Sequence, residues 1–201
     1  MTTREKLLNA SLDLFSVRGY RAVSIREIAS AVGIRESAVY NHFTNKRNIM
    51  ESLAAEAVKK IAEFSQSLHR RAVRHPEKKN TPGIRESYSR LALELFLFYT
   101  QDDFISKFRK LLTIEQFADP EAGNLYRGYF VGGVIKEQKQ LFADFVKTGY
   151  FVPCDPETAA VQFYSPVFLF CSDYDTGGDG RMLQRKLKSH TEQFAKLYEK
   201  N

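Results

Sequence analysis

The chain has 201 residues, a formal net charge of +6 and two cysteines. This length allows a real hydrophobic core and a division into two domains. No run of about 18 apolar residues occurs, and the polar start MTTREK lacks the apolar region of a signal peptide, so we expect a cytoplasmic protein without a membrane partner. Cys154 and Cys171 are too few for a disulfide framework, and we expect free buried thiols.

The excess positive charge is concentrated near the N-terminus. Residues 1–50 hold eight Lys or Arg against four Asp or Glu, whereas residues 51–201 hold 22 basic and 20 acidic residues. A basic region of this kind is the electrostatic footprint of a DNA-binding surface, whose affinity falls steeply with salt. Charge alone does not prove this role, so the local pattern of residues has to support it.

Two helices are expected at the start of the chain. In a capping box, a Ser or Thr is followed three residues later by Glu, and each side chain bonds a backbone N–H of the other residue. Thr2 begins the first helix in this way and Ser24 begins the second. Gly19 and Gly33 follow the two helices at positions where glycine ends a helix most easily.

A short turn at Gly33 leads into a third helix, for which the sequence leaves about two turns, residues 36–43. Val39 and Phe43 lie on its inner side, so its outer face is polar and aromatic. This outline is typical of a helix-turn-helix, which places side chains in the DNA major groove. A connector helix is expected over about residues 45–70.

Two residues at the start of the third helix are unusual. Arg35 cannot cap the helix, so Ser37 or water must do so, which would move the helix start by one or two residues. Glu36 is acidic beside a polyanion. It either accepts a hydrogen bond from a cytosine N4 amino group or pairs with Arg35, and we favour the pairing.

The segment also has the spacing G-h-x-x-x-x-h-Y-x-H-F-x-x-K, where h is hydrophobic. With this spacing it resembles the TetR/AcrR family of bacterial transcriptional regulators over roughly the first fifty residues. The family usually has Ser or Thr where Arg35 stands, and often Gly, Pro or Ala where Ser37 stands. The residues that match the family pattern are Ser24, Arg26, Ile28, Ala29, Gly33, Val39, Tyr40, His42, Phe43 and Lys46.

The resemblance implies that this segment faces DNA. Arg26 is expected to read guanine, and the Ala38 methyl to contact a thymine methyl. Tyr40, His42 and Lys46 are expected to hold phosphates, and a phosphate would explain a lysine in the first turn of a helix. The alternatives are a solvated face for the cations and core packing for Tyr40. The predicted DNA-binding residues are Ser24, Arg26, Arg35, Ser37, Ala38, Tyr40, Asn41, His42 and Lys46.

The remainder of the chain also reads as helical. The basic stretch 69–80 favours a solvated surface over a second nucleic-acid patch. We therefore predict an all-α protein of about nine helices, with a three-helix DNA-binding domain over residues 1–50 and a helical ligand-binding and dimerisation domain over residues 51–201. Further helices are expected over 84–99, 104–117, 119–147, 158–174 and 181–199.

The larger domain is rich in Phe and Tyr, which indicates either an apolar pocket or an ordinary core. The pair Gly132-Gly133 and the proline Pro166 interrupt expected helices, which favours kinks and a cavity. The resemblance implies that an effector binds here, and the lining favours an apolar or aromatic ligand, or a cation held by cation–π contacts. The predicted pocket residues are Phe96, Tyr99, Phe104, Phe108, Tyr126, Tyr129, Phe130, Phe163 and Phe168.

The last two helices carry apolar stripes, and in the resembling family such helices pack against their copies as a four-helix bundle. A helix-turn-helix that reads two half-sites requires a dimer. Packing within one chain is the alternative. The predicted interface residues are Phe163, Val167, Phe170, Leu183, Leu187, Thr191, Phe194 and Tyr198.

The sequence and the resemblance together predict a homodimeric, ligand-responsive repressor that binds a palindromic operator. The alternative is a helical interaction or architectural module whose helix-turn-helix is only structural. No H-E-x-x-H, G-x-S-x-G, phosphate-binding glycine loop or metal-spaced Cys/His cluster occurs. We therefore expect neither an enzyme nor a bound metal or cofactor.

Overall fold

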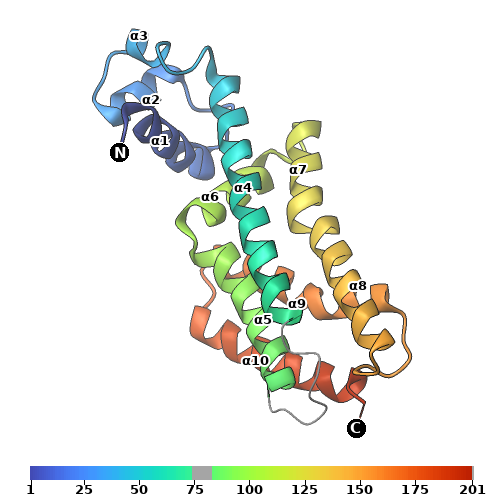
Figure 1. Cartoon of the computed structure of the whole chain (residues 1–201). Coiled ribbons are helices and arrows are strands. Elements are labelled where there is room, and N and C mark those ends of the chain that lie inside the picture. Colours follow the sequence, from blue (N-terminus) through green and yellow to red (C-terminus); the bar gives the residue numbers. More distant parts are fainter. Residues whose placement is uncertain (74–82, 201) are drawn as a thin grey trace. The chain divides into compact units, whose positions relative to one another are not determined.

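The computed structural model describes residues 1–73 and 83–200. The side chains of residues 69–89 lie outside this description, so the expectation for the basic stretch 69–80 does too. The described residues form ten helices and no strand beyond one isolated bridge, which confirms the all-α prediction (Figure 1). None of these helices is both long and apolar enough to cross a bilayer. Their bounds are α1 Thr3–Arg18, α2 Ile25–Val32, α3 Glu36–Val39, α4 Lys46–Val73, α5 Gly83–Gln101, α6 Asp103–Glu115, α7 Pro120–Phe130, α8 Gly132–Lys147, α9 Pro156–Asp175 and α10 Gly180–Tyr198.

The chain folds into two compact units. The first unit contains residues 1–63 and 103–126, and the second contains residues 64–102 together with the chain from residue 127 onward. The first unit is therefore larger than the expected domain of residues 1–50, because α6 packs against α1. Lys107 of α6 reaches Asp13 of α1 with a distance of 2.6 Å between Nζ and Oδ1.

The helix starts that were predicted from capping residues are confirmed. Thr2 and Ser24 both form complete capping boxes, at the starts of α1 and α2. Gly33 ends α2 in the left-handed conformation with φ 76°, which a residue with a side chain rarely adopts. Asp155 and Asp179 accept backbone N–H groups at the starts of α9 and α10. Local sequence therefore fixes where these four helices begin.

The third helix is shorter than expected. α3 covers only Glu36–Val39, and residues 40–42 form turns instead of a second helical turn. Its start does not shift, since Arg35 occupies the N-cap position without a side-chain hydrogen bond. The N–H of His42 bonds the Val39 carbonyl at 2.9 Å, which tightens the chain after the helix. Val39 and Phe43 are buried as expected and anchor this short segment.

The second unit is held together by an aromatic core. Phe142 of α8 lies at its centre, with ring centroids 5.3 Å from Phe151, 5.4 Å from Phe163 and 5.6 Å from Phe194. Near the C-terminus, the Val152 N–H bonds the Tyr198 carbonyl at 2.8 Å. These contacts join α8, α9, α10 and the loop before α9 into one packed body.

The single helix expected over residues 119–147 is instead two helices, α7 and α8, which meet at Val131. At this junction a Cβ placed on Gly133 would lie 1.8 Å from the carbonyl oxygen of Gly128. Only glycine allows so close an approach of two backbone segments. The carbonyl of Phe130 is satisfied by the buried hydroxyl of Tyr164, which donates to it at 2.7 Å.

Two further expectations concern Pro166 and the cysteines. α9 continues across Pro166, so this proline does not end the helix, and the expected kink there stays a prediction. The Ser165 hydroxyl donates to the Val161 carbonyl at 2.6 Å on the same helix. Both cysteines are free, but only Cys171 is buried, and Cys154 is half-buried. Burial raises the pKa of the Cys154 thiol, which disfavours its reactive thiolate form.

We predict that Gly133→Ala destabilises the second unit by about 1–3 kcal/mol, because the added Cβ overlaps the Gly128 carbonyl and forces the junction apart. Gly132→Ala is the matched control, since its Cβ would meet no atom closer than 3.6 Å. Urea unfolding followed by circular dichroism measures both variants. Equal midpoints for the two variants would contradict this account of the junction.

The lowered pKa of Glu27 predicts how the stability of the protein depends on pH. Hydrogen bonds from the Ser24 backbone and hydroxyl, followed by the bond from Arg18, lower the pKa of Glu27 from 4.5 to about 2. Because the folded pKa lies below the unfolded one, this carboxylate stabilises the fold above pH 4.5, and the contribution is lost as the pH falls towards 2. The melting temperature of Glu27→Gln should therefore lie below that of the wild type at neutral pH, and the gap should close on acidification. A gap that is constant with pH would show that Glu27 does not act through its charge.

Candidate nucleic-acid interface

The outward face of the helix-turn-helix consists of polar and aromatic side chains. Ser37, Asn41 and His42 are exposed, Ala38 is half-buried, and Tyr40 keeps 52% of its surface exposed. Core packing, the alternative for Tyr40, therefore does not describe this residue. The hydroxyl, amide, imidazole and phenol groups along this face are those that bind phosphates and base edges.

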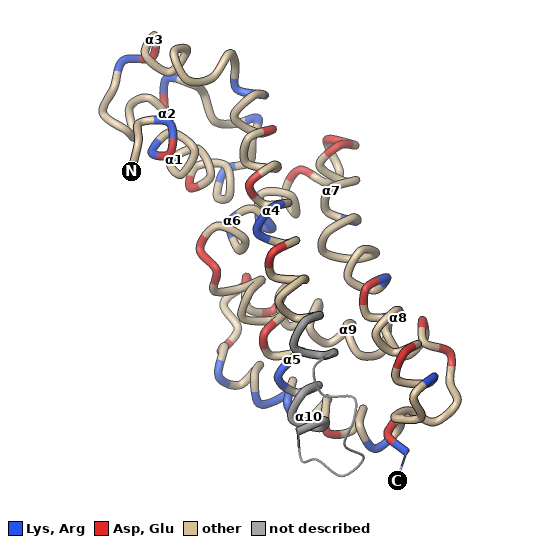
Figure 2. The backbone as a smooth tube through the Cα atoms, in the orientation of Figure 1, with Lys and Arg blue, Asp and Glu red and all other residues tan. Residues whose placement is uncertain are grey.

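Two exposed arginines flank this face. Arg26 lies in the first turn of α2, and Arg35 directly precedes α3. Neither has an ion pair or a hydrogen-bond partner among the residues that the structure describes. Arg18, by contrast, pairs with Glu27 at 2.7 Å. Figure 2 marks basic positions on α2, before α3 and at the start of α4. The two unpaired guanidinium groups are thus available to an anionic partner.

Ser24 has a structural role as well as an exposed position. Its hydroxyl accepts the Glu27 N–H at 3.2 Å and also lies 2.8 Å from a Glu27 carboxylate oxygen, to which it donates. These bonds complete the capping box of α2 and fix the direction in which Arg26 leaves the helix. A contact from Ser24 to DNA therefore stays a prediction, while its capping role is visible in the fold.

Lys46 has partners inside the protein. Its ammonium group donates to the carbonyls of Tyr20 at 2.9 Å and Val23 at 2.8 Å, and lies 4.3 Å from the centre of the Tyr20 ring. Burial lowers the pKa of Lys46, and the negative charges of Glu115 and Glu27 oppose this shift. We expected a phosphate to explain the placement of Lys46. The two internal carbonyl partners explain this placement without a phosphate. An ammonium has three donors, and a phosphate contact through the third stays a prediction.

The favoured pairing of Arg35 with Glu36 is wrong. Both side chains are exposed, and within the described parts of the chain neither of them takes part in an ion pair. Neighbouring residues at a helix start leave the chain in different directions, which explains why these two do not meet. The other alternative for Glu36, a contact with a base, stays open.

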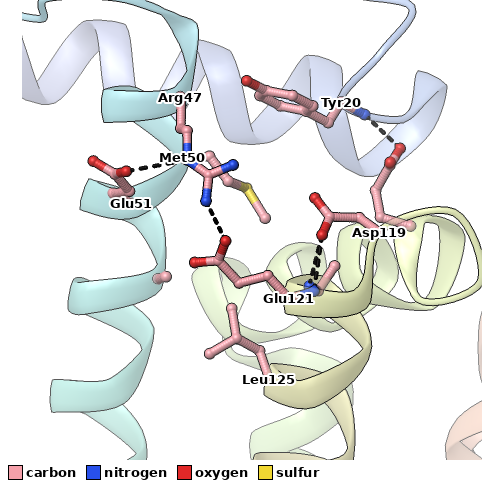
Figure 3. A pocket seen from close by; sticks show the side chains of 10 residues that line it. Tyr20, Arg47, Met50, Glu51, Asp119, Glu121 and Leu125 are labelled. Carbon is pink, nitrogen blue, oxygen red and sulfur yellow. Dashed lines mark hydrogen bonds and ion pairs between the residues drawn. The ribbon is translucent and has the colours of Figure 1, made fainter.

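The loop after α1 and the start of α4 lie against the end of α6 and the start of α7, as Figure 3 shows. The buried carboxylate of Glu115, 6% exposed, accepts the Tyr20 N–H at 2.8 Å. Arg21 donates to the Ala118 carbonyl at 2.8 Å, and Arg47 pairs with Glu121. Tyr20, Glu115, Arg47 and Glu121 border a small cavity of about 40 Å³.

Glu115 was not among the residues singled out from the sequence. It lies 95 positions after Tyr20, and no local pattern links the two. The Tyr20 N–H follows Gly19, whose own conformation, with φ 81°, turns the chain out of α1. A buried carboxylate at the end of α6 therefore holds the loop between α1 and α2.

The predicted effector-pocket residues are divided between the two units. Phe104, Phe108 and Tyr126 belong to the first unit and the other six to the second. In the second unit, Tyr99 and Phe130 are buried and their rings pack edge-to-face at 5.4 Å. The ring of Phe163 lies in the core against Phe142 and Phe194, whereas 38% of Phe168 is exposed. Core packing, the stated alternative, therefore describes Phe163.

Most of the predicted dimer residues are core residues of the single chain, which corrects their expected place at a shared surface. The apolar stripe of α10 is buried against α5 and α9 of the same unit. Phe170 and Tyr198 alone of the eight are half-exposed. The exposed apolar side chains of α9 are different residues, namely Val161, Phe168 and Leu169. The buried residues of the predicted set are Phe163, Val167, Leu183, Leu187, Thr191 and Phe194.

Known proteins resemble this chain most clearly in the first unit. Residues 7–53 match the family model described as bacterial regulatory proteins, tetR family. The transcriptional repressor KstR2 of Rhodococcus jostii is 38% identical over 50 residues, which are 25% of this chain and 24% of that protein. The regulator IcaR of Staphylococcus aureus is 27% identical over 124 residues, 61% of this chain and 59% of its own length. The chain spans between 24% and 29% of the length of the first curated relatives it matches.

Solved structures resemble it over its whole length. A TetR-family regulator from Pseudomonas syringae pv. tomato has a TM-score of 0.70 at 20% identity and covers 99% of this chain and 98% of its own. AibR, in complex with isovaleryl coenzyme A and operator DNA, has a TM-score of 0.65 at 17% identity, with 97% of each chain covered. These likenesses show a shared fold. The N-terminal motif of the chain thus matches the tetR family model over residues 7–53, and the chain as a whole shares its fold with TetR-family regulators.

Proposed function

We propose that the chain is a sequence-specific transcriptional repressor that binds a palindromic operator as a homodimer and leaves it when a small apolar or aromatic effector binds. The outward face of the helix-turn-helix carries this proposal. Arg26 and Arg35 have no partner in the part of the chain that the structure describes, and they lie beside the exposed polar side chains of α3. Such groups bind phosphates and base edges.

Several relatives support the repressor role. KstR2 and the class D and H tetracycline repressors are named repressors, and IcaR is named a negative transcriptional regulator of a biofilm operon. The AibR structure holds both operator DNA and isovaleryl coenzyme A, so a protein of this fold can bind a small ligand and DNA. We extend both properties to this chain.

The mechanism follows from the geometry of DNA. A dimer reads two half-sites about 34–36 Å, or a multiple of this, apart along the duplex. An effector that changes the separation of the two recognition helices therefore lowers the affinity for the operator. Thermal-shift screening of small molecules with the purified protein, followed by operator release, would identify the effector.

The rival is a helical interaction or architectural module with a purely structural helix-turn-helix. A mobility-shift experiment with palindromes from the DNA upstream of the protein's own gene separates the two functions. A regulator gives a sequence-specific shift that weakens steeply with salt. A protein that shifts no palindrome at low salt would favour the rival.

We predict that Arg26→Ala weakens operator binding by about 1–3 kcal/mol and relaxes base preference at one position, because its unpaired guanidinium can bind guanine. Lys59→Ala is the matched control, since Lys59 is exposed and lies about 20 Å further along α4 than Lys46. Fluorescence anisotropy on single-base operator variants measures the effect. An equal loss on every operator would move Arg26 to the phosphate contacts.

The exposed apolar residues of α9 predict the dimer surface. Leu169 keeps 61% of its surface exposed, and a second copy would bury it. Leu169→Lys should therefore shift the protein towards monomer in light scattering and lower its operator affinity. Phe117→Ser is the control, because Phe117 is 91% exposed but belongs to the first unit. A Leu169→Lys protein that stays dimeric would place the interface elsewhere.

A further inference from the structure

The recognition helix begins with an unusual pair of neighbours. Arg35 is the N-cap of α3 and Glu36 is its first residue, so a cation and an anion follow each other where Figure 2 marks the start of α3. Both side chains are exposed, and neither has a partner among the described residues. A single unsatisfied cation on a DNA-facing surface is easily understood. The carboxylate beside it needs a separate explanation.

A carboxylate at this place is unfavourable for non-specific DNA binding. The phosphate groups of the duplex repel it. Affinity for DNA of any sequence comes from cations that neutralise these phosphates, and the negative charge of Glu36 lowers that affinity. Within the protein, Glu36 neither pairs with Arg35 nor caps the helix, and a carboxylate in the first turn of a helix of only four residues gains little from the helix dipole. Its role is therefore expected at the bases, where a donor can meet it.

The chemistry of the major groove supplies such a donor. The N4 amino group of cytosine donates to carboxylates, whereas O6 and N7 of guanine accept from the fork of an arginine. The N-terminal residues of a recognition helix are those that reach base edges. Consecutive Cα atoms lie about 3.8 Å apart and successive bases about 3.4 Å, so the two residues can serve one base pair or two neighbouring ones.

We propose that Arg35 and Glu36 together determine specificity, with Arg35 reading a guanine and Glu36 a cytosine where α3 enters the major groove. Each operator half-site then carries G·C base pairs at this point. This inference rests on the proposed DNA-binding function and adds the chemical identity of the bases that are read. Glu36 thereby discriminates between sequences. Its charge lowers the affinity for DNA in general, and a hydrogen bond from a cytosine offsets this loss where a cytosine is present.

The test is selection of half-sites from a randomised palindromic library, followed by affinity measurements on the selected operators. The wild type should favour cytosine at one position by about 5- to 150-fold over other bases. Glu36→Gln keeps the size of the side chain but presents an amide, which pairs with adenine, so the preference at that position should change from cytosine to adenine. Glu36→Ala should lose the preference there and bind unrelated DNA more tightly.

Arg35→Ala should lose a guanine preference at the same or the neighbouring base pair and leave the other positions unchanged. Lys59→Ala, on the exposed face of α4, should change none of these preferences. Melting temperatures show that each variant is folded. Position 36 has no intramolecular side-chain bond to lose, so a fall in stability is not expected there.

Two results would overturn the proposal. Glu36→Gln and Glu36→Ala variants that select the same half-sites as the wild type would show that Glu36 reads no base. The second result is an Arg35→Ala variant whose affinity falls by the same factor for every sequence and whose plot of log affinity against log salt is less steep by about one. Such a variant would place Arg35 on a phosphate. A wild-type protein that enriches no sequence at all would contradict the proposed function itself, which separates the two failures.

Discussion

A helix of four residues is not stable in water by itself, and the proposed DNA-binding surface depends on how its neighbours hold α3. Val39 and Phe43 fasten it to the core of the first unit from below. On the other side of the motif, Lys46 satisfies two carbonyls of the loop between α1 and α2, while Glu115 satisfies the N–H of Tyr20. A buried backbone group without a partner costs about 1–3 kcal/mol, so these bonds keep the loop in one conformation. The exposed arginines therefore lie next to a loop whose backbone groups are satisfied within the protein.

The parts of the fold that sequence could predict are those decided within a few residues. A capping box needs only a hydroxyl and a carboxylate three positions apart, and both Thr2 and Ser24 form one. The length of α3 and the division between α7 and α8 could not be predicted in this way. The first depends on turns that form after Val39, and the second on the close approach of Gly128 and Gly133, which no periodicity reveals.

The candidate site shows the same limit. Its exposed residues could be predicted because they lie in one continuous segment with the spacing of a known motif. Glu115 could not, since its partner Tyr20 lies 95 positions away. The stripe on α10 was identified as apolar, but periodicity shows only which face is buried and not which chain buries it. Leu183 and Phe194 proved to be covered by their own chain. Exposed side chains such as Leu169 are found only when the neighbours are known.

The placement of α6 in the first unit also bears on how the protein can be divided. The chain passes from one unit to the other after residues 63, 102 and 126, so neither unit is a continuous stretch. A fragment that ends at residue 63 would contain the whole helix-turn-helix and still lack Glu115 and Ala118, the partners of Tyr20 and Arg21. The DNA-binding unit is thus assembled only after much of the chain has been synthesised. A fragment of residues 1–63 would thus lack α6, which completes this unit.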